Sequence, residues 1–307
     1  MRSVTLIGGS GLIGTALSRT LSRAGYRVFV LDLEPPHPSV EGLVEWSPCD
    51  VTNRSELESI PPCESVYFLA ALLGKRCVEE PELGWHTNVN GLIHTVEAIR
   101  AMRHRPTLTF FSSASVYAFG VNSPIEERDS AVPSSLYASS KLLGEAMLHA
   151  AGTAFGLRSI ILRPFTAYGP GPGSGKKGHL IWTWIERALR GDPIVIHGDG
   201  TQTVDLVHTE DLAALCVAAE SRQVASTTPP VLNVGCGRES TLLEVAEWFR
   251  SSLPGLRVEF ERSIRPAQRR NFASIDRARE LLGYAPRVLP SEGIKGVIDS
   301  ASSSTTR

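Results

Sequence analysis

Short apolar runs of strand length alternate along this chain with longer stretches in which apolar residues recur at helical spacing. Residues 3–7 and 27–32 have the pattern of strands, and residues 12–24 between them have the pattern of a helix. A strand, a helix and a second strand in this order form the βαβ unit of a parallel sheet. The alternation continues with expected strands at 65–70, 108–112 and 159–162 and expected helices at 85–102 and 137–151. The pattern therefore predicts an α/β protein built around a parallel sheet.

The second half of the chain departs from this rhythm. From about residue 167 onward glycine and proline become frequent, as in Gly169-Pro170-Gly171-Pro172-Gly173, and loops of this kind commonly build a ligand pocket. We expect residues 1–166 to form the core of the sheet domain. Residues 167–299 should form mainly a smaller substrate-binding lobe, with some segments returning to the sheet domain. The Ser/Thr-rich tail at 300–307 has no apolar partner, and we expect it to be disordered.

The bulk composition disfavours several kinds of partner. The 307 residues include 31 Lys and Arg against 32 Asp and Glu, so nothing electrostatic indicates nucleic acid or an anionic membrane. The five cysteines are widely spread and never form a C-x-x-C pair, which argues against a disulfide framework and against a zinc site. There is no separate basic leader before the first strand and no long apolar run. We expect a cytoplasmic protein that binds a small molecule and no metal.

A glycine-rich loop follows the first strand and opens the first helix. It reads Gly8-Gly9-Ser10-Gly11-Leu12-Ile13-Gly14. Missing side chains let the backbone approach a pyrophosphate, whose charge then lies at a helix N-terminus. Such a loop in isolation is as often a structural turn, but its place between a strand and a helix indicates a dinucleotide site. We therefore expect a Rossmann-type, doubly wound sheet.

The identity of the dinucleotide depends on Asp32, which closes the second strand. A carboxylate at this place accepts hydrogen bonds from both ribose hydroxyls and repels the 2′-phosphate of NADP. Its neighbours Leu33 and Glu34 supply no cation. Although Asp32 could merely end a strand, its position after the glycine loop favours NAD as the cofactor.

Three further residues suggest the chemistry. Tyr137 and Lys141 are four residues apart on an expected helix, so their side chains share one face, and Ser113 follows the expected strand at 108–112. A free phenol has a pKa of about 10, so a tyrosine that acts as a base near neutrality needs a cation beside it, and Lys141 can supply one. The Tyr-x-x-x-Lys pattern alone is usually an exposed helix pair. Behind a dinucleotide loop it predicts that Tyr137 removes a hydroxyl proton while Ser113 orients the oxygen.

At this point the sequence resembles the extended short-chain dehydrogenases/reductases, in particular the NAD-dependent sugar-nucleotide epimerase and dehydratase group. The resemblance covers nearly the whole chain. Besides the features above, it rests in the first half on Cys49-Asp50-Val51, Leu69-Ala70-Ala71, Asn88-Val89-Asn90-Gly91, Ser112-Ser113-Ala114-Ser115-Val116-Tyr117 and Tyr137-Ala138-Ser139-Ser140-Lys141. In the second half it rests on Leu162-Arg163-Pro164-Phe165, Tyr168-Gly169-Pro170-Gly171, Gly198-Asp199-Gly200-Thr201-Gln202-Thr203, Asp211-Leu212-Ala213, Asn233-Val234-Gly235 and Leu281-Leu282-Gly283-Tyr284.

The resemblance implies a role for individual residues. Asp50 and Val51 would contact the adenine, Ala70 and Ala71 would line the pyrophosphate, and Asn88 would support the active-site end of the sheet. The residues expected at the cofactor are Gly8, Gly11, Leu12, Ile13, Gly14, Asp32, Asp50, Val51, Leu69, Ala70, Ala71, Asn88, Tyr137, Lys141 and Pro164. Those expected at the substrate are Ser113, Ser115, Tyr137, Thr166 and Arg265. Relatives usually pair through the two helices that correspond to 85–102 and 137–151, which implies a homodimer.

The sequence departs from the family pattern at three places in its second half, and in relatives the residues at the first two of them help to hold the substrate diphosphate. Thr166 stands where Asn is common, Val204 stands where Arg is common, and Ala267-Gln268 replaces a common Gly-Asp. Valine cannot imitate the bidentate contacts of an arginine. The grip on the diphosphate should therefore be altered, with Arg265, Arg269, Lys176 and Lys177 as candidates to compensate.

The two residues directly after Ser113 suggest the type of reaction. Dehydratases of the family carry an Asp-Glu pair there, because loss of water needs its own acid and base, whereas this chain has Ala114 and Ser115. The stretch resembles that of the 4-epimerases, so we expect a sugar-nucleotide 4-epimerase that works through a transient 4-keto sugar. The alternatives are a sugar-nucleotide reductase, dehydrogenase or dehydratase and, in another class, an NAD-sensing regulatory protein on the same fold.

Overall fold

The fold is built on one parallel sheet. The computed structural model describes residues 2–118, 124–172, 180–263 and 270–305. Seven strands pair in the order β11-β6-β5-β4-β1-β2-β3, and every pairing is parallel. Their bounds are β1 Ser3–Ile7, β2 Arg27–Asp32, β3 Glu45–Pro48, β4 Ser65–Phe68, β5 Thr107–Phe111, β6 Ser159–Pro164 and β11 Val231–Val234. The order reverses beside β1, which makes the sheet doubly wound and confirms the Rossmann-type prediction.

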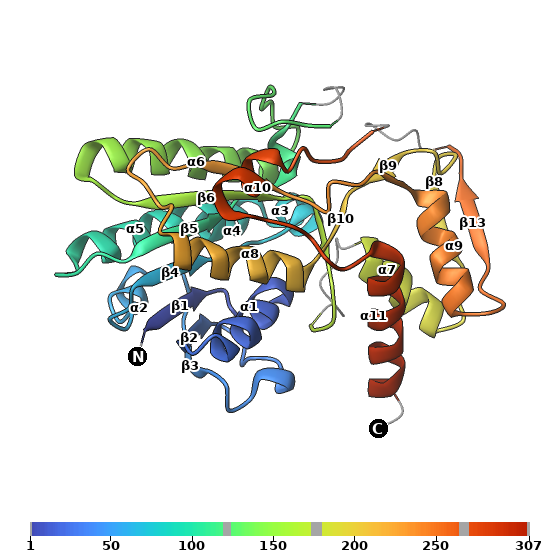
Figure 1. Cartoon of the computed structure of the whole chain (residues 1–307), viewed down its shortest axis with the longest axis horizontal. Helices are drawn as coiled ribbons and strands as arrows, with labels where there is room; N and C mark the ends of the chain where they lie inside the picture. Colours follow the sequence, from blue (N-terminus) through green and yellow to red (C-terminus); the bar gives the residue numbers. More distant parts are fainter. Residues whose placement is uncertain (1, 119–123, 173–179, 264–269, 306–307) are drawn as a thin grey trace.

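Helices cover both faces of this sheet (Figure 1). On one face lie α1 (Leu12–Arg23) and α8 (Thr209–Arg222), and on the other lie α5 (Gly91–Ala101) and α6 (Leu136–Phe155). Neighbouring residues of one strand serve different faces: Leu6 packs in the core under α1, and Ile7 packs in the core under α5. This alternation is what a strand buried on both sides requires, and it explains the continuous apolar runs in the sequence.

Shorter elements connect the strands on the first half of the sheet. They are a 3₁₀ turn at Pro38–Val40, α2 (Arg54–Leu57), α3 (Gly74–Glu79), α4 (Pro81–Trp85), a π-helical turn at His86–Asn90 and a second 3₁₀ turn at Ala114–Val116. The helix expected at 85–102 is thus divided, because the π-helical turn lies between Trp85 and the start of α5. In the described residues, no helix is both long and apolar enough to span a membrane.

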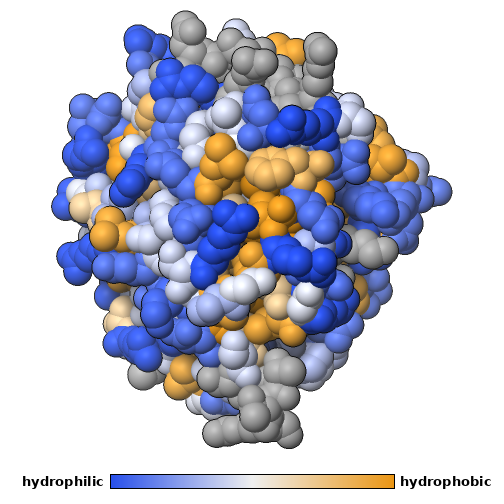
Figure 2. Space-filling model, turned by 90° about the vertical axis from the view of Figure 1, so that its right-hand side faces the viewer, coloured by the Kyte–Doolittle hydropathy of each residue, from blue (hydrophilic) through white to orange (hydrophobic). Residues whose placement is uncertain are grey.

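A smaller lobe stands beside the sheet (right side of Figure 1). It contains α7 (Leu180–Leu189), α9 (Leu242–Ser252), α11 (Pro290–Thr305) and a two-stranded sheet of β8 (Ile194–His197) and β13 (Val258–Glu261). Trp184 and Phe249 meet edge to face in its core, with ring centroids 5.7 Å apart. Figure 2 looks onto this lobe and shows an apolar patch bordered by hydrophilic residues; Leu243 and Phe260 are exposed apolar residues of the lobe.

The remaining elements join the lobe to the sheet. Strands β7 (Thr166–Tyr168) and β10 (Leu206–His208) pair in parallel, and β9 (Thr203–Val204) pairs with β12 (Ser240–Thr241). Chain segments after residue 166 also return to the sheet domain, where β11 extends the sheet, α8 packs on α1 and α10 (Asp276–Leu282) packs near β11.

The expectation of a disordered tail is wrong for residues 300–305, which continue α11. Ile294, Val297 and Ile298 on this helix are buried against the core of the lobe, and Ala301 packs beside them one turn later. An apolar face of helical period therefore reaches past Ser300, and serine and threonine on the other positions do not stop the helix. Residues 306–307 lie outside the described part of the chain.

Candidate active site

The glycine loop lies where β1 ends and α1 begins, and its glycines have different reasons to be there. Gly8 has a φ of +79°, and a Cβ on it would lie 2.4 Å from the backbone nitrogen of Ala70. A Cβ on Gly14 would lie 2.3 Å from the carbonyl oxygen of Gly9. These two glycines therefore let the loop pack against its own surroundings. At Gly11 a Cβ would meet only the Gly8 carbonyl oxygen, at an ordinary contact distance of 3.8 Å, so packing does not require a glycine there.

Gly11 stands at the start of α1. Gly11 is the N-cap residue of α1 and makes no side-chain cap, so the first amides of the helix have no side-chain acceptor at the cap position. Such amides, together with the helix dipole, favour an anionic group. Loop and helix start thus fit the pyrophosphate of a dinucleotide.

Asp32 lies next to this loop and supports it directly. Its carboxylate accepts the backbone N–H of Ser10 at 2.9 Å on one oxygen and that of Glu34 at 3.1 Å on the other. A carboxylate can accept about four hydrogen bonds, so two remain for ribose hydroxyls. A structural role for Asp32 and a role as ribose ligand are therefore compatible.

Two further predicted positions meet the loop at the same edge of the sheet. The backbone nitrogens of Leu69 and Ala70 donate to the Ile7 carbonyl at 2.8 and 3.0 Å, which brings the end of β4 against Gly8. Asp50 follows β3 and accepts both the N–H and the hydroxyl of Thr52, while Val51 is buried against α5. The carboxyl ends of β1, β2, β3 and β4 thus surround one place, where the sequence predicts the cofactor.

Asn88 lies in the π-helical turn and joins three parts of the site. Its side-chain oxygen accepts the N–H of Leu72 at 2.7 Å, and its amide nitrogen donates to the Leu72 carbonyl at 3.1 Å and to the Ser140 hydroxyl at 3.0 Å. The side chain is fully buried, so these bonds replace the water that it loses. Asn88 thereby holds the loop after β4 against α6, beside Lys141.

Ser113, Tyr137 and Lys141 come together as the sequence predicts. Ser113 follows β5, and its side chain lies close enough to that of Tyr137 to lower the pKa of the phenol. The Lys141 ammonium lies 5.7 Å from the centroid of the Tyr137 ring and donates to the Phe111 carbonyl at 2.8 Å. Ser113 also accepts the hydroxyl and the N–H of Ser115, at 2.9 and 3.1 Å.

Burial governs the protonation of this trio in the protein alone. It raises the pKa of Tyr137 to about 12, against a smaller lowering by the Ser113 hydrogen bond. It also lowers the pKa of Lys141 to about 8. The expected lowering of the phenol pKa by Lys141 does not figure among these causes, and desolvation, which opposes the phenolate, dominates in the chain by itself.

Comparison with known proteins agrees with this geometry. Residues 4–235 match the NAD dependent epimerase/dehydratase family. The chain belongs to that family. Membership confirms the sequence-based resemblance, the expectation of an enzyme and NAD as its cofactor.

Individual members of the family align along nearly the whole chain. The chain is 28% identical to UDP-glucuronate 4-epimerase 4 of Arabidopsis thaliana, over 95% of this chain and 74% of that protein. The solved structure of a UDP-glucose 4-epimerase from Thermotoga maritima, with UDP-glucose, superposes with a TM-score of 0.88 at 25% identity and covers 99% of both chains. MoeE5 in complex with UDP-glucose and NAD gives a TM-score of 0.87 at 28% identity, again over 99% of both chains.

Only some of the residues expected at the substrate lie in the described part of the chain. Pro164 ends β6, Thr166 begins β7 and is half-buried, and Val204 lies in β9 opposite Ser240. Arg265, the arginine expected at the substrate, lies outside the described residues, as do Lys176, Lys177 and Arg269. Arg270, the described cation next to them in sequence, forms an ion pair with Glu239 at 2.6 Å.

Sequence reasoning missed two residues that organise the site. Ser140 accepts from Asn88 and donates to the Tyr137 carbonyl at 2.8 Å, and Glu145 lies one helical turn beyond Lys141 and is buried. The available signal for Glu145 was its spacing, since a charged residue four positions after Lys141 shares the same helix face.

Proposed function

We propose that this protein is a UDP-sugar 4-epimerase. The observation that carries the proposal is the assembly of Ser113, Tyr137 and Lys141 at the end of β5, with Ala114 and Ser115 where a dehydratase would have carboxylates. The similar proteins named above, which act on or bind UDP-glucose or UDP-glucuronate, support the choice of substrate class. NAD, when bound, would supply the oxidation and the later reduction at the sugar C4.

The chain's own residues would manage the proton of the C4 hydroxyl. Tyr137 takes this proton on its phenolic oxygen and returns it after the sugar has turned, and Ser113 orients the sugar oxygen. Burial of Tyr137 without a partner would keep it protonated at neutral pH, so positive charge close to the phenol is essential. Lys141, held by the Phe111 carbonyl, supplies part of that charge and binds the ribose of the nicotinamide.

The cofactor contacts belong to the same proposal. Gly8, Gly11 and Gly14 with Leu12 and Ile13 would hold the pyrophosphate at the start of α1, assisted by Leu69, Ala70 and Ala71. Asp32 would hold the adenosine ribose, and Asp50 and Val51 would contact the adenine. Asn88 and Pro164 would complete the site around the nicotinamide. These residues lie at the same edge of the sheet, where the parallel strands end, and this supports the assignments.

The substrate would lie between this edge and the small lobe. Ser115 would contact the sugar, since it donates to Ser113 and lies beside it. Thr166 would approach the diphosphate at the start of β7, with Arg265 as the cation that Val204 does not provide. Arg270 is already paired with Glu239, which supports assigning the diphosphate contact to another cation.

We also propose a homodimer located in the cytoplasm. Ile93 on α5 and Leu136 and Leu143 on α6 are exposed by 39%, 47% and 42%, and exposed apolar residues on neighbouring helices are what a second subunit would cover. All five cysteines are free, which supports a reducing compartment.

The test is turnover of UDP-glucose and UDP-glucuronate by the purified protein, with Tyr137→Phe as the diagnostic variant. Loss of the proton-accepting oxygen should lower kcat by about 10² to 10⁴ while the fold and most of the NAD affinity remain. NMR of the products identifies the C4 epimer, and circular dichroism and NAD titration check the variant. If the variant keeps more than about a tenth of the activity, Tyr137 is not the base.

A further inference from the structure

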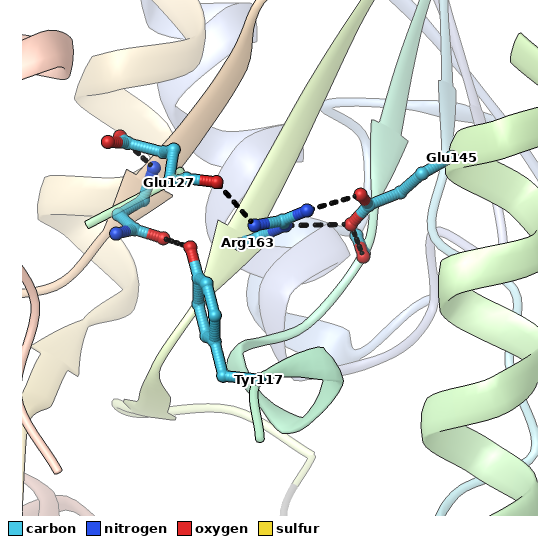
Figure 3. Close-up of polar contacts among 6 residues, drawn as sticks. Tyr117, Glu127, Glu145 and Arg163 are labelled. Atoms are coloured by element: carbon cyan, nitrogen blue, oxygen red, sulfur yellow. Dashed lines mark hydrogen bonds and ion pairs between the residues drawn. The ribbon is translucent and has the colours of Figure 1, made fainter. Parts of the chain in front are cut away.

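The helix that carries Tyr137 and Lys141 has a third buried polar residue on the same face. Glu145 follows Lys141 by four residues, so the three side chains form a row along α6. The Glu145 carboxylate forms a two-point ion pair with Arg163 of β6, with N–O distances of 2.9 and 2.6 Å (Figure 3). Both side chains are less than a tenth exposed.

Arg163 is itself held from the other side. Its remaining terminal nitrogen donates to the carbonyl of Glu127 at 3.2 Å, and its guanidinium lies 4.8 Å from the centroid of the Tyr117 ring. The Tyr117 hydroxyl donates to the side chain of Asn233 at 2.6 Å. The carboxylate of Glu145 is therefore fixed in place by contacts that come from β6, β11 and the loop before α6.

This fixed carboxylate reaches the reacting residues through Ser112. The Ser112 hydroxyl donates to Glu145 at 2.5 Å, and Ser112 directly precedes Ser113 in the chain. One residue earlier, the Phe111 carbonyl accepts the Lys141 ammonium. Two residues of α6 thus hold two consecutive residues at the end of β5. The next residue is Ser113, whose side chain lies near the phenol of Tyr137.

We propose that Glu145 is a positioning residue, which holds Ser112 so that the Ser113 hydroxyl stays against the phenol of Tyr137. A buried ion pair is weak evidence for stability, because the loss of hydration offsets much of its attraction. Its attachment to the strand end beside Ser113 gives it a part in catalysis. The link to turnover rests on the proposed function, whereas the contact itself can be followed without any substrate.

The experiment removes the Ser112 contact alone and uses a matched control. Ser112→Ala deletes the hydroxyl and leaves the ion pair of Glu145 with Arg163 in place. The control is Ser65→Ala: the buried Ser65 hydroxyl also donates to a helix glutamate, Glu220 on α8, at 2.8 Å, but at the opposite end of β4 from the site. Each variant loses one buried serine-to-carboxylate bond, and Ser65→Ala also loses the contact of its hydroxyl with that of Thr107 at 2.8 Å. The control should therefore lose at least as much thermal stability as Ser112→Ala.

The first readout is NMR of protein labelled with ¹³C at the tyrosine Cζ, in which the Tyr137 signal is the one that Tyr137→Phe removes. The hydrogen bond to Ser113 affects the chemical shift of this carbon. The signal should move in Ser112→Ala and stay in place in Ser65→Ala. No movement in Ser112→Ala, or equal movement in both variants, would overturn the proposal.

The second readout is kinetic and uses a UDP-sugar that the wild-type protein turns over. Ser112→Ala should lower kcat by about tenfold, because a displaced catalytic group costs rate, while KM changes by less than about twofold. Ser65→Ala should keep both values. If kcat falls equally in both variants, the role of Glu145 is structural and it does not position the reacting residues. A wild-type protein inactive on every UDP-sugar would overturn the proposed function and leave the NMR result to decide the positioning role.

Discussion

The Asp32 carboxylate supports the glycine loop and can also bind a ribose, so its replacement should change the affinity for the cofactor. It holds the glycine loop through Ser10 and Glu34 and retains acceptor capacity for a ribose. NAD should bind far more tightly than NADP, because a 2′-phosphate would meet this charge at close range. Asp32→Ala should lower the affinity for NAD, since the loop loses its support. It should also reduce the difference in affinity between NAD and NADP. Calorimetric titration measures both, and equal or tighter binding of NADP to the wild-type protein would contradict the assignment.

Lys141 should leave a signature in the pH dependence of stability. Burial lowers its pKa from 10.5 to about 8 in the folded protein. Between these values the unfolded chain binds more protons than the folded one, so the free energy of unfolding rises with pH. Relative to Lys141→Met, the wild-type protein should gain about 2 kcal/mol between about pH 7 and about pH 9.5, as measured by urea unfolding.

The control for this experiment is Lys75→Met, which removes an exposed lysine whose ion pair with Glu79 lies at the surface. The same measurement on this control gives the pH dependence that replacement of an exposed lysine produces, against which the Lys141→Met result is compared. A stability difference for Lys141→Met that changes with pH no more than that of the control would mean that the Lys141 ammonium is not desolvated.

At the level of elements, the sequence predicted most helices and strands, and its errors have physical causes. Helix α6 was expected at 137–151 and runs over Leu136–Phe155, ending at Gly156, whose φ of +74° suits the left-handed cap. The periodicity at 85–102 does not reveal the π-helical turn, in which Asn88 makes its contacts with Leu72 and Ser140. Composition predicts a disordered tail after residue 299, but the apolar period of α11 continues to Ala301.

For the site, local motifs were sufficient only where the residues lie close together in the sequence. The glycine loop, the Tyr137 and Lys141 pair and Ser113 could be predicted because each follows a strand or lies on one helix. The contact between Glu145, Arg163 and Ser112 joins α6, β6 and the end of β5, and no spacing in the sequence encodes it. A long-range buried network of this kind needs the fold before it can be seen.

The proposed dimer can be tested on α6. Leu143→Glu places a charge where the second subunit should bury an apolar side chain, so the dimer should dissociate to monomer, as followed by analytical ultracentrifugation. Leu243→Glu is the matched control, because Leu243 in α9 is equally exposed, at 42%, on the small lobe. Dissociation by Leu243→Glu, or a Leu143→Glu variant that assembles like the wild type, would exclude the α5 and α6 surface.

At the scale of the whole molecule, the sheet domain and the lobe meet where the chemistry is expected. Strand β6 ends at Pro164 and β7 begins at Thr166, whose N–H donates to the Asp205 carbonyl at 2.9 Å. Asp205 is buried and accepts three backbone N–H groups, from Cys236, Gly237 and Ala273. Segments that lead from the catalytic end of the sheet into the lobe are therefore tied together at one residue, Asp205, through its backbone carbonyl and its carboxylate.

The reaction type is a property of this whole assembly and can be determined with isotopes. In a 4-epimerase the hydrogen that leaves C4 returns to the same carbon of the same molecule, so no solvent hydrogen enters carbon and no external cofactor is consumed. Incubation with UDP-glucose and UDP-glucuronate in deuterated water should give C4 epimers without deuterium on carbon, as detected by mass spectrometry and NMR. A product lighter by one water would establish dehydration instead. Deuterium at C3 or C5 would reveal enolisation of the keto sugar, which needs an acid and a base beyond Tyr137, and Ala114 and Ser115 provide neither.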